Sequence, residues 1–128
     1  MKKLELEKND IDYLVLHMPN GKFPLQACKT LGFEKEKLMP SLVVQRIGNC
    51  YSGSSMLGLT AVLDIAQPDE RILMTSYGSG AGSDSFSFKV TDKILKVRDA
   101  CKKTEDYIKN KTYIDYATYT RMRRKLKE

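Results

Sequence analysis

The sequence predicts an α/β protein in which a mixed sheet of about three strands is flanked by helices, in the order β-α-α-β-β-α. Three short runs rich in apolar and β-branched residues, 11–17, 71–77 and 85–91, have the length and pattern of strands. A glycine-rich turn at 78–84 joins the second run to the third, which predicts an antiparallel edge. The long connection between the first two runs leaves room for helices, as a mixed sheet requires.

The segments outside the strands have helical patterns of different strength. Residues 23–31 form an amphipathic helix pattern, and Gly32 is placed to end it. Residues 34–38 predict one further helical turn, whereas 42–46 fit either a helix or an extended approach to the next turn. Residues 92–127 are predicted to be helical.

The segment 53–66 predicts a helix that is apolar or small on nearly every side, and the stretch 47–55 places polar and hydroxyl residues at its start. A helix without a polar face has to be buried all round. Its polar start would then lie inside the protein, where free N–H groups and the helix dipole favour negative charge. We therefore expect the floor of an active site here, with a second polypeptide needed to cover the helix.

The charge of the chain limits its partners. The 128 residues suffice for one domain, and the net charge of +6 is concentrated in the tail. Such a tail can contact nucleic acid or a membrane surface, but no nucleic-acid module accompanies it. We expect a solvated helix or a face for an anionic partner or cofactor phosphates, with neither nucleic acid nor membrane as partner. The basic residues at the end are Arg121, Arg123, Arg124, Lys125 and Lys127.

The three cysteines, Cys28, Cys50 and Cys101, show neither a CxxC motif nor a His/Cys ligand spacing. We therefore expect no disulfide framework and no metal site. No stretch is long enough to span a bilayer, and the N-terminus lacks an apolar signal core. The expected location is the cytoplasm.

His17 is the only histidine, and it ends the first predicted strand. Functional sites in open α/β sheets gather at the carboxyl ends of strands, so His17 is a candidate catalyst, although a structural role explains a lone histidine as well. Asn49 and Cys50 precede the apolar helix. The asparagine amide could bind an oxyanion or cap a turn, and the thiol could be a nucleophile or fill space. Two weaker candidates are Ser79 in the glycine-rich turn and Lys22 for a phosphate.

Residues 17–24, 47–55 and 76–84, together with the tail around 106–108 and 113–116, resemble archaeal-type hydroxymethylglutaryl-CoA synthase of the thiolase superfamily. The resemblance covers nearly the whole chain but corresponds to only the last third or so of that enzyme. It implies a thiolase-like fold, in which two similar α/β halves stack as five layers. This chain would be an incomplete C-terminal half spanning 1–128, with 92–128 as its helical tail.

The resemblance also implies a chemistry, a Claisen-type condensation. Acetyl-CoA acetylates an enzyme cysteine, a glutamate removes a methyl proton, and the carbanion attacks the ketone of acetoacetyl-CoA. Hydrolysis then releases hydroxymethylglutaryl-CoA, a precursor of mevalonate and isoprenoids, with no cofactor beyond the two thioester substrates. In this scheme His17 is the general acid/base, Asn49 holds the acyl chain or thioester oxygen, Ser79 the developing carboxylate, and Lys22 the CoA moiety.

Two departures from the family matter. Its nucleophilic cysteine and base glutamate lie upstream of the region present here, and Cys50 stands where the family typically has threonine. Gln26 stands where an arginine commonly helps to bind substrate. We therefore expect the C-terminal subunit of a split enzyme, whose partner is an N-terminal synthase chain with that cysteine and glutamate. Further homo- or hetero-oligomers, including one with acetoacetyl-CoA thiolase, are expected partners, and a truncated or decayed gene product explains the sequence equally well.

Two other functions fit the same residues. One is a non-catalytic module that binds acyl-CoA or docks onto a thiolase-like complex, for which His17 would be dispensable. The other is a self-contained thioesterase using Cys50 and His17, but no acid that could orient the histidine is visible in the sequence.

Overall fold

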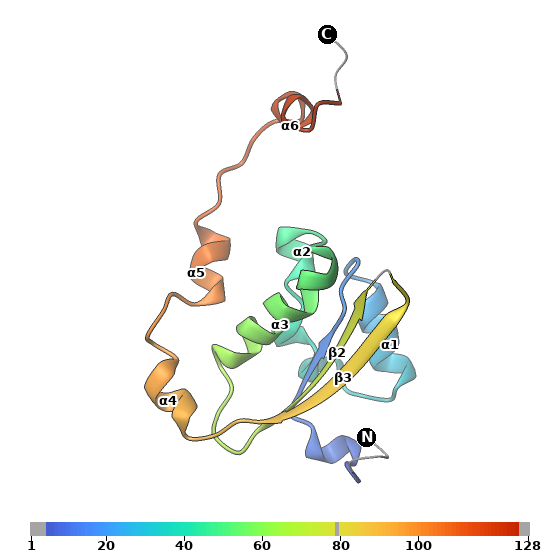
Figure 1. The fold of residues 1–128 in the computed structure, drawn as a ribbon, viewed down its shortest axis with the longest axis vertical. Helices are drawn as coiled ribbons and strands as arrows, with labels where there is room; N and C mark the ends of the chain where they lie inside the picture. The colour runs from blue at the N-terminus through green and yellow to red at the C-terminus, as the bar shows by residue number, and fades with distance from the viewer. Residues whose placement is uncertain (1–4, 79, 126–128) are drawn as a thin grey trace.

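The computed structural model describes residues 5–78 and 80–125 of the chain. Its centre is a three-stranded sheet of β1 (Tyr13–Leu16), β2 (Arg71–Gly78) and β3 (Gly82–Lys89), in the order β1-β2-β3 (Figure 1). β1 runs parallel to β2, and β2 runs antiparallel to β3. The predicted α/β class, the mixed sheet and its antiparallel edge are confirmed.

Helices cover the two faces of this sheet. α1 (Phe23–Thr30) lies on one face, where its Cys28 is buried in a cluster with Leu14 and Leu73. α3 (Ser54–Leu63) lies on the other face, where Val62 is buried beside Val15 and Ile72. The result is a three-layer α/β/α arrangement, visible in Figure 1, that places the start of α3 at the carboxyl ends of β1 and β2.

Local chemistry explains where α1 begins and ends. The Oδ1 atom of Asn20 accepts hydrogen bonds from the backbone N–H groups of Lys22 at 2.8 Å and Phe23 at 3.0 Å. At the other end Gly32 adopts a φ of 71° and donates its N–H to the carbonyl of Lys29. Only glycine takes this conformation freely, so the predicted helix stop at Gly32 is confirmed.

Short helical turns fill the connection between α1 and α3. The turn predicted at 34–38 is the 3-10 helix η3 (Lys35–Lys37), and η4 (Met39–Ser41) follows it. Residues 42–46, which fit either a helix or an extended segment, contribute to the short helix α2 (Val44–Ile47). The 3-10 helix η5 (Tyr51–Gly53) then leads into α3. A further 3-10 helix, η2 (Lys8–Asp10), precedes β1.

The prediction of helix over 92–127 is correct for three short segments but not for the residues between them. The described part of this tail forms α4 (Lys93–Val97), α5 (Thr104–Lys109) and α6 (Tyr116–Met122), separated by irregular segments. Figure 1 shows α4 and α5 beside α3, whereas α6 stands away from the sheet. The helices are short because little of the tail is buried: Ile108 and Thr120 are its only buried residues between 92 and 125.

Asp115 caps α6 and makes the helix sensitive to pH. Its carboxylate accepts a hydrogen bond from the backbone N–H of Thr118 at 2.7 Å, and this bond holds the pKa of Asp115 below its ordinary value. A lowered pKa means that the cap stabilises α6 above the ordinary aspartate pKa and is lost as the pH falls through the folded value. The Thr118 amide resonance should therefore titrate with a midpoint below that of a free aspartate. Asp115→Asn, which keeps an accepting oxygen, should leave this resonance insensitive to pH, and an unchanged titration in that variant would contradict the assignment.

The sequence predicts that this chain alone does not cover α3 on every side, and the structure agrees, although η4 and α5 contact the helix as well as the sheet. Ser54, Ser55, Gly58 and Val62 are buried, but the side chain of Met56 remains 55% exposed. α3 thus carries apolar side chains that this chain leaves exposed to solvent. Within residues 5–78 and 80–125, no helix is long and apolar enough to cross a membrane.

Candidate functional site

α3 approaches β1 unusually closely because of Gly58. A Cβ atom added at Gly58 would lie 3.0 Å from the backbone oxygen of Ser41, 3.1 Å from Cε of Met18 and 3.2 Å from Cγ1 of Val15. Such distances are tighter than ordinary side-chain contacts, so a side chain here would require its neighbours to shift, and glycine permits the close packing of helix and strand. This contact sets the middle of α3 against β1 and against Met18, which follows the strand.

His17, the predicted acid/base, directly follows β1 at this end. The residue is half-buried, and its ring meets the ring of Tyr77 edge to face, with the centroids 5.6 Å apart and the planes at 60°. Its Nδ1 atom is buried and has no hydrogen-bond partner in the part of the chain that the structure describes. A buried imidazole nitrogen without a partner is costly, which indicates that a further group completes this site.

Serines lie at the start of α3, and one of them joins the helix to β2; the sequence marked the polar stretch 47–55 but assigned neither Ser54 nor Ser55 a role of its own. The hydroxyl of Ser55 donates a hydrogen bond to Oγ of Ser76 at 2.8 Å. Ser54 is only 2% exposed, and its Oγ is buried with no partner among the described residues. The signal that could have found Ser54 is its spacing of four residues from Gly58, which puts both on one face of the helix.

Asn49 and Cys50 form the turn before η5, which packs against β2. The Oδ1 atom of Asn49 accepts a hydrogen bond from the backbone N–H of Tyr51 at 2.7 Å, and Tyr51 has a φ of 52°. The interpretation of Asn49 as a turn-forming residue is therefore confirmed. This hydrogen bond uses only the side-chain oxygen, so the NH2 group of the exposed Asn49 amide takes no part in it. Cys50 Sγ lies 3.8 Å from the carbonyl oxygen of Gly48.

The remaining predicted site residues lie at the periphery. Lys22 is exposed just before α1, at the N-cap position of that helix. Ser79 lies outside the described residues. The geometry thus groups His17 with the start of α3, while the roles assigned to Asn49, Ser79 and Lys22 stay predictions.

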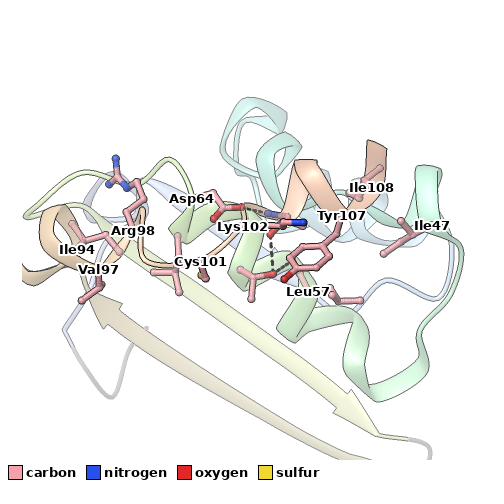
Figure 2. Close-up of a pocket in the computed structure, with 13 residues that line it drawn as sticks. Ile47, Leu57, Asp64, Ile94, Val97, Arg98, Cys101, Lys102, Tyr107 and Ile108 are labelled. Carbon is pink, nitrogen blue, oxygen red and sulfur yellow. Dashed lines mark hydrogen bonds between the residues drawn. The ribbon is translucent and has the colours of Figure 1, made fainter. Parts of the chain in front are cut away.

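A well-formed groove of the described chain lies elsewhere. Its volume is about 560 Å³, and it runs between the outer face of α3 and the α4–α5 segment (Figure 2). Apolar side chains dominate it, and none of the predicted site residues lines it. The principal lining residues are Leu57, Leu63, Ile94, Val97, Cys101 and Tyr107.

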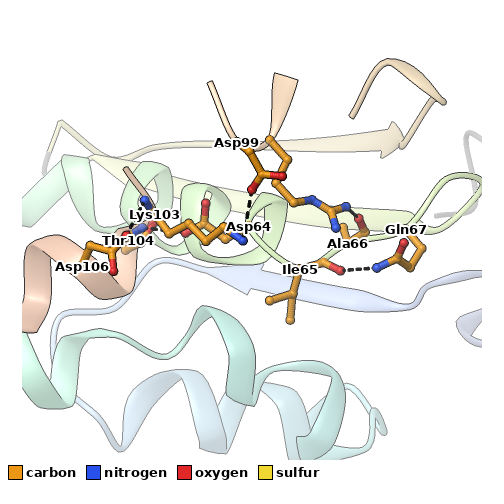
Figure 3. A network of polar contacts seen from close by, with 9 residues as sticks. Asp64, Ile65, Ala66, Gln67, Asp99, Lys103, Thr104 and Asp106 are labelled. Atoms are coloured by element: carbon orange, nitrogen blue, oxygen red, sulfur yellow. Dashed lines mark hydrogen bonds and ion pairs between the residues drawn. The ribbon is translucent and has the colours of Figure 1, made fainter. Parts of the chain in front are cut away.

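A set of polar contacts fastens the tail to α3 beside this groove, as Figure 3 shows in part. The backbone N–H of Thr104 donates to the carboxylate of Asp64 at 2.6 Å, which ties α5 to the end of α3. Arg46 and Glu105 form an ion pair at 2.5 Å, and the guanidinium of Arg98 donates to the carbonyl of Ala66. The groove is therefore framed by a fixed segment of the tail.

The three cysteines differ in environment, and all three are free thiols. Cys28 is buried, and this burial, with a smaller contribution from the nearby carboxylate of Glu36, raises the pKa of its thiol. Cys50 is half-buried and Cys101 is exposed. Among the described residues no three His, Cys, Asp or Glu side chains gather as a metal site would require.

Comparison with known proteins yields one protein family and several relatives. Residues 1–90 match the family model described as 3-oxoacyl-[acyl-carrier-protein (ACP)] synthase III C terminal. A hydroxymethylglutaryl-CoA synthase of Methanopyrus kandleri is 53% identical over 127 residues, which are 99% of this chain and 36% of the relative. The synthase of Methanocella arvoryzae is 58% identical over 118 residues, 92% of this chain and 34% of the relative. The chain thus spans about a third of the length of these curated relatives.

Solved structures share the fold at low sequence identity. The HMG synthase of the curacin biosynthetic pathway, solved in complex with a holo donor-ACP, superposes with a TM-score of 0.78 at 22% identity. It covers 94% of this chain, which corresponds to 34% of that structure. PksG, an HMG-CoA synthase from Bacillus subtilis, gives a TM-score of 0.75 at 23% identity, over 92% of this chain and 34% of PksG. The thiolase-like fold class expected from the sequence is therefore confirmed for a partial domain.

Proposed function

Because this chain belongs to the family of C-terminal regions of 3-oxoacyl-[acyl-carrier-protein] synthase III, we propose that it is the C-terminal catalytic portion of a hydroxymethylglutaryl-CoA synthase. The proposed reaction condenses acetyl-CoA with acetoacetyl-CoA and needs no cofactor besides these thioesters. The observation that carries the proposal is the identity of 53% to an archaeal synthase along 99% of the chain. The identity extends past residue 90, so the tail is shared as well.

In the proposed reaction His17 anchors and protonates the ketone oxygen of the acetoacetyl group. Its position supports this role, because it lies at the carboxyl end of a strand and beside the start of α3. Imidazole can donate or accept a proton near neutral pH, as an acid/base catalyst must. Asn49 is proposed to hold the thioester oxygen through its free amide, Ser79 the developing carboxylate, and Lys22 the CoA moiety.

The nucleophilic cysteine and the base glutamate are proposed to come from an N-terminal portion that covers α3. An apolar surface in the structure supports this partner. Phe86 and Phe88 of β3 pair with Met74 and Ile72, so they lie on the α3 face of the sheet. Their rings stack with centroids 6.0 Å apart, yet they are 47% and 38% exposed, and Met56 on α3 is exposed beside the same layer. A polypeptide that covered these side chains would bury apolar area.

The setting of the proposed enzyme follows from its thiols and its relatives. Three free cysteines suit a reducing compartment, so we place the assembly in the cytoplasm. Further homo- or hetero-oligomerisation, including contact with an acetoacetyl-CoA thiolase that makes the second substrate, remains part of the proposal.

The apolar groove between α3 and α5 favours a second candidate function. A groove of about 560 Å³ is large enough for a small-molecule ligand, and it lies apart from His17. This arrangement suits a non-catalytic subunit that binds acyl-CoA or docks onto a thiolase-like complex. In that case replacing His17 would leave binding unchanged.

Complementation tests the proposal directly. The chain is mixed with the part of the Methanopyrus kandleri synthase that precedes its matched region, and hydroxymethylglutaryl-CoA formation is followed by release of free CoA. We expect condensation only when both polypeptides are present, and none when the nucleophilic cysteine of the added portion is replaced by alanine. Association without condensation would favour the docking subunit, and no association would overturn the proposed partner.

A further inference from the structure

The turn that carries Asn49 is bounded by two residues with left-handed backbone conformations. Gly48, which ends α2, has a φ of 80° and a ψ of −176°, and Tyr51 has a φ of 52°. A Cβ atom at Gly48 would meet no atom within 4 Å, so the position needs glycine for its backbone and not for space. A left-handed tyrosine is unusual, because its Cβ crowds the following carbonyl oxygen. Such strain persists only where the surroundings impose it.

Two hydrogen bonds of the main chain hold Tyr51 in this conformation. Its N–H donates to Oδ1 of Asn49 at 2.7 Å, and its carbonyl oxygen accepts the N–H of Ser54. Packing of the side chain does not impose the conformation, because Tyr51 is 77% exposed. The left-handed backbone is therefore set by the hydrogen bonds around Asn49 and not by the ring.

The bond from Tyr51 decides which end of the Asn49 amide remains available. A backbone N–H can only donate, so the atom that meets it must be the side-chain oxygen and not the NH2 group. The NH2 group is thereby left for another partner, and Asn49 is exposed. Accepting a bond at Oδ1 also polarises the amide, which strengthens the NH2 group as a donor.

We propose that Tyr51 is a positioning residue, whose backbone N–H fixes the Asn49 amide so that its NH2 group and not its oxygen faces the bound thioester. This inference deepens the proposed function and rests on it. The atom that Asn49 holds must then be a hydrogen-bond acceptor, which the thioester oxygen is and the methylene groups of an acyl chain are not. That oxygen accepts before the reaction begins, so the effect of Tyr51 falls on KM more than on kcat.

The first test measures hydrogen exchange of the Tyr51 amide by NMR in the full 128-residue chain. The amide should be protected in the natural chain and in Asn49→Asp, whose carboxylate still accepts the bond. In Asn49→Ala it should exchange about tenfold faster, as expected for the loss of one hydrogen bond. Asn110→Ala, at an exposed position after α5, is the matched control and should keep the natural rate. Exchange in the natural chain as fast as in Asn49→Ala would overturn the proposal.

The second test removes only the N–H of Tyr51. Incorporation of the α-hydroxy acid of tyrosine at position 51 replaces this N–H by an ester oxygen and keeps the ring. In the complemented assembly this change should raise the KM for acetoacetyl-CoA about two- to tenfold, with little change in kcat. A purely structural role would instead reduce the active fraction, and thus kcat at an unchanged KM, and that result would overturn the proposal.

Asn49→Asp shows which end of the amide meets the substrate. It presents a carboxylate oxygen to the thioester oxygen, so it should raise this KM more than Asn49→Ala does. A KM close to the natural value in Asn49→Asp would mean that an acceptor faces the substrate, against the proposal.

Hydrogen exchange does not depend on turnover, so the two levels of inference can fail separately. A protected Tyr51 amide in a chain that supports no condensation would refute the proposed enzyme function and leave the pairing of Tyr51 with Asn49 intact. An unprotected amide in an active assembly would refute the pairing and leave the enzyme function intact.

Discussion

Replacing His17 by alanine should abolish condensation in the complemented assembly, with kcat lowered by about 10²- to 10⁴-fold, the usual contribution of a positioned acid/base. The physical reason is that no other imidazole exists in the chain to supply a proton to the acetoacetyl oxygen. The measurement is the steady-state rate of CoA release at saturating substrate. His17 is half-buried beside Tyr77, so the thermal melting of the variant must be compared with that of the natural chain.

A second substitution separates holding the oxygen from protonating it. His17→Gln keeps an N–H donor but cannot transfer a proton near neutral pH, so it should retain KM while kcat stays low. Asn110→Ala, a change at an exposed position after α5, serves as the matched control and should leave both constants unchanged. Full activity in His17→Ala would refute the catalytic role and favour the docking subunit.

The sheet could be predicted from the sequence because its signals are local. The apolar run at 11–17 and the alternating run at 85–91 need no knowledge of their neighbours to be recognised as strands. Gly32 likewise marks the end of α1 through its own conformation, a φ of 71°. The tail was harder to predict, because few of its residues are buried. The length of a helix in a protein is decided by tertiary packing more than by its sequence pattern.

The candidate site could be predicted only in part, for a related reason. His17 and Asn49 stand out by residue type, and the structure places His17 beside the start of α3. Ser54 does not stand out by residue type, because serine in a first helical turn is ordinary, and only its spacing from Gly58 sets it apart. How closely α3 packs on β1 depends on Gly58, whose neighbours Met18 and Val15 lie forty or more positions away in the sequence. No local pattern contains this information.

Replacing Gly58 by valine should strongly destabilise the chain. The first atom of the new side chain would already lie 3.0 Å from the backbone oxygen of Ser41 and 3.2 Å from Cγ1 of Val15, and the two methyl groups would extend further. Overpacking of this kind costs about 1–3 kcal/mol or more, which exceeds the modest helix-propensity gain over glycine. We expect the free energy of unfolding to fall by about 2 kcal/mol and Tm by roughly 10 °C, measured by circular dichroism.

Gly53→Val is the matched control, because it adds the same side chain one and a half turns earlier. A Cβ at Gly53 meets no atom within 4 Å, and its φ of −71° suits any residue, so the melting temperature should hardly change. Gly58→Val should also disturb the ring signals of His17, because it pushes α3 away from β1. Equal melting of the two variants would mean that α3 is free to move away from the strand and would contradict the role given to Gly58.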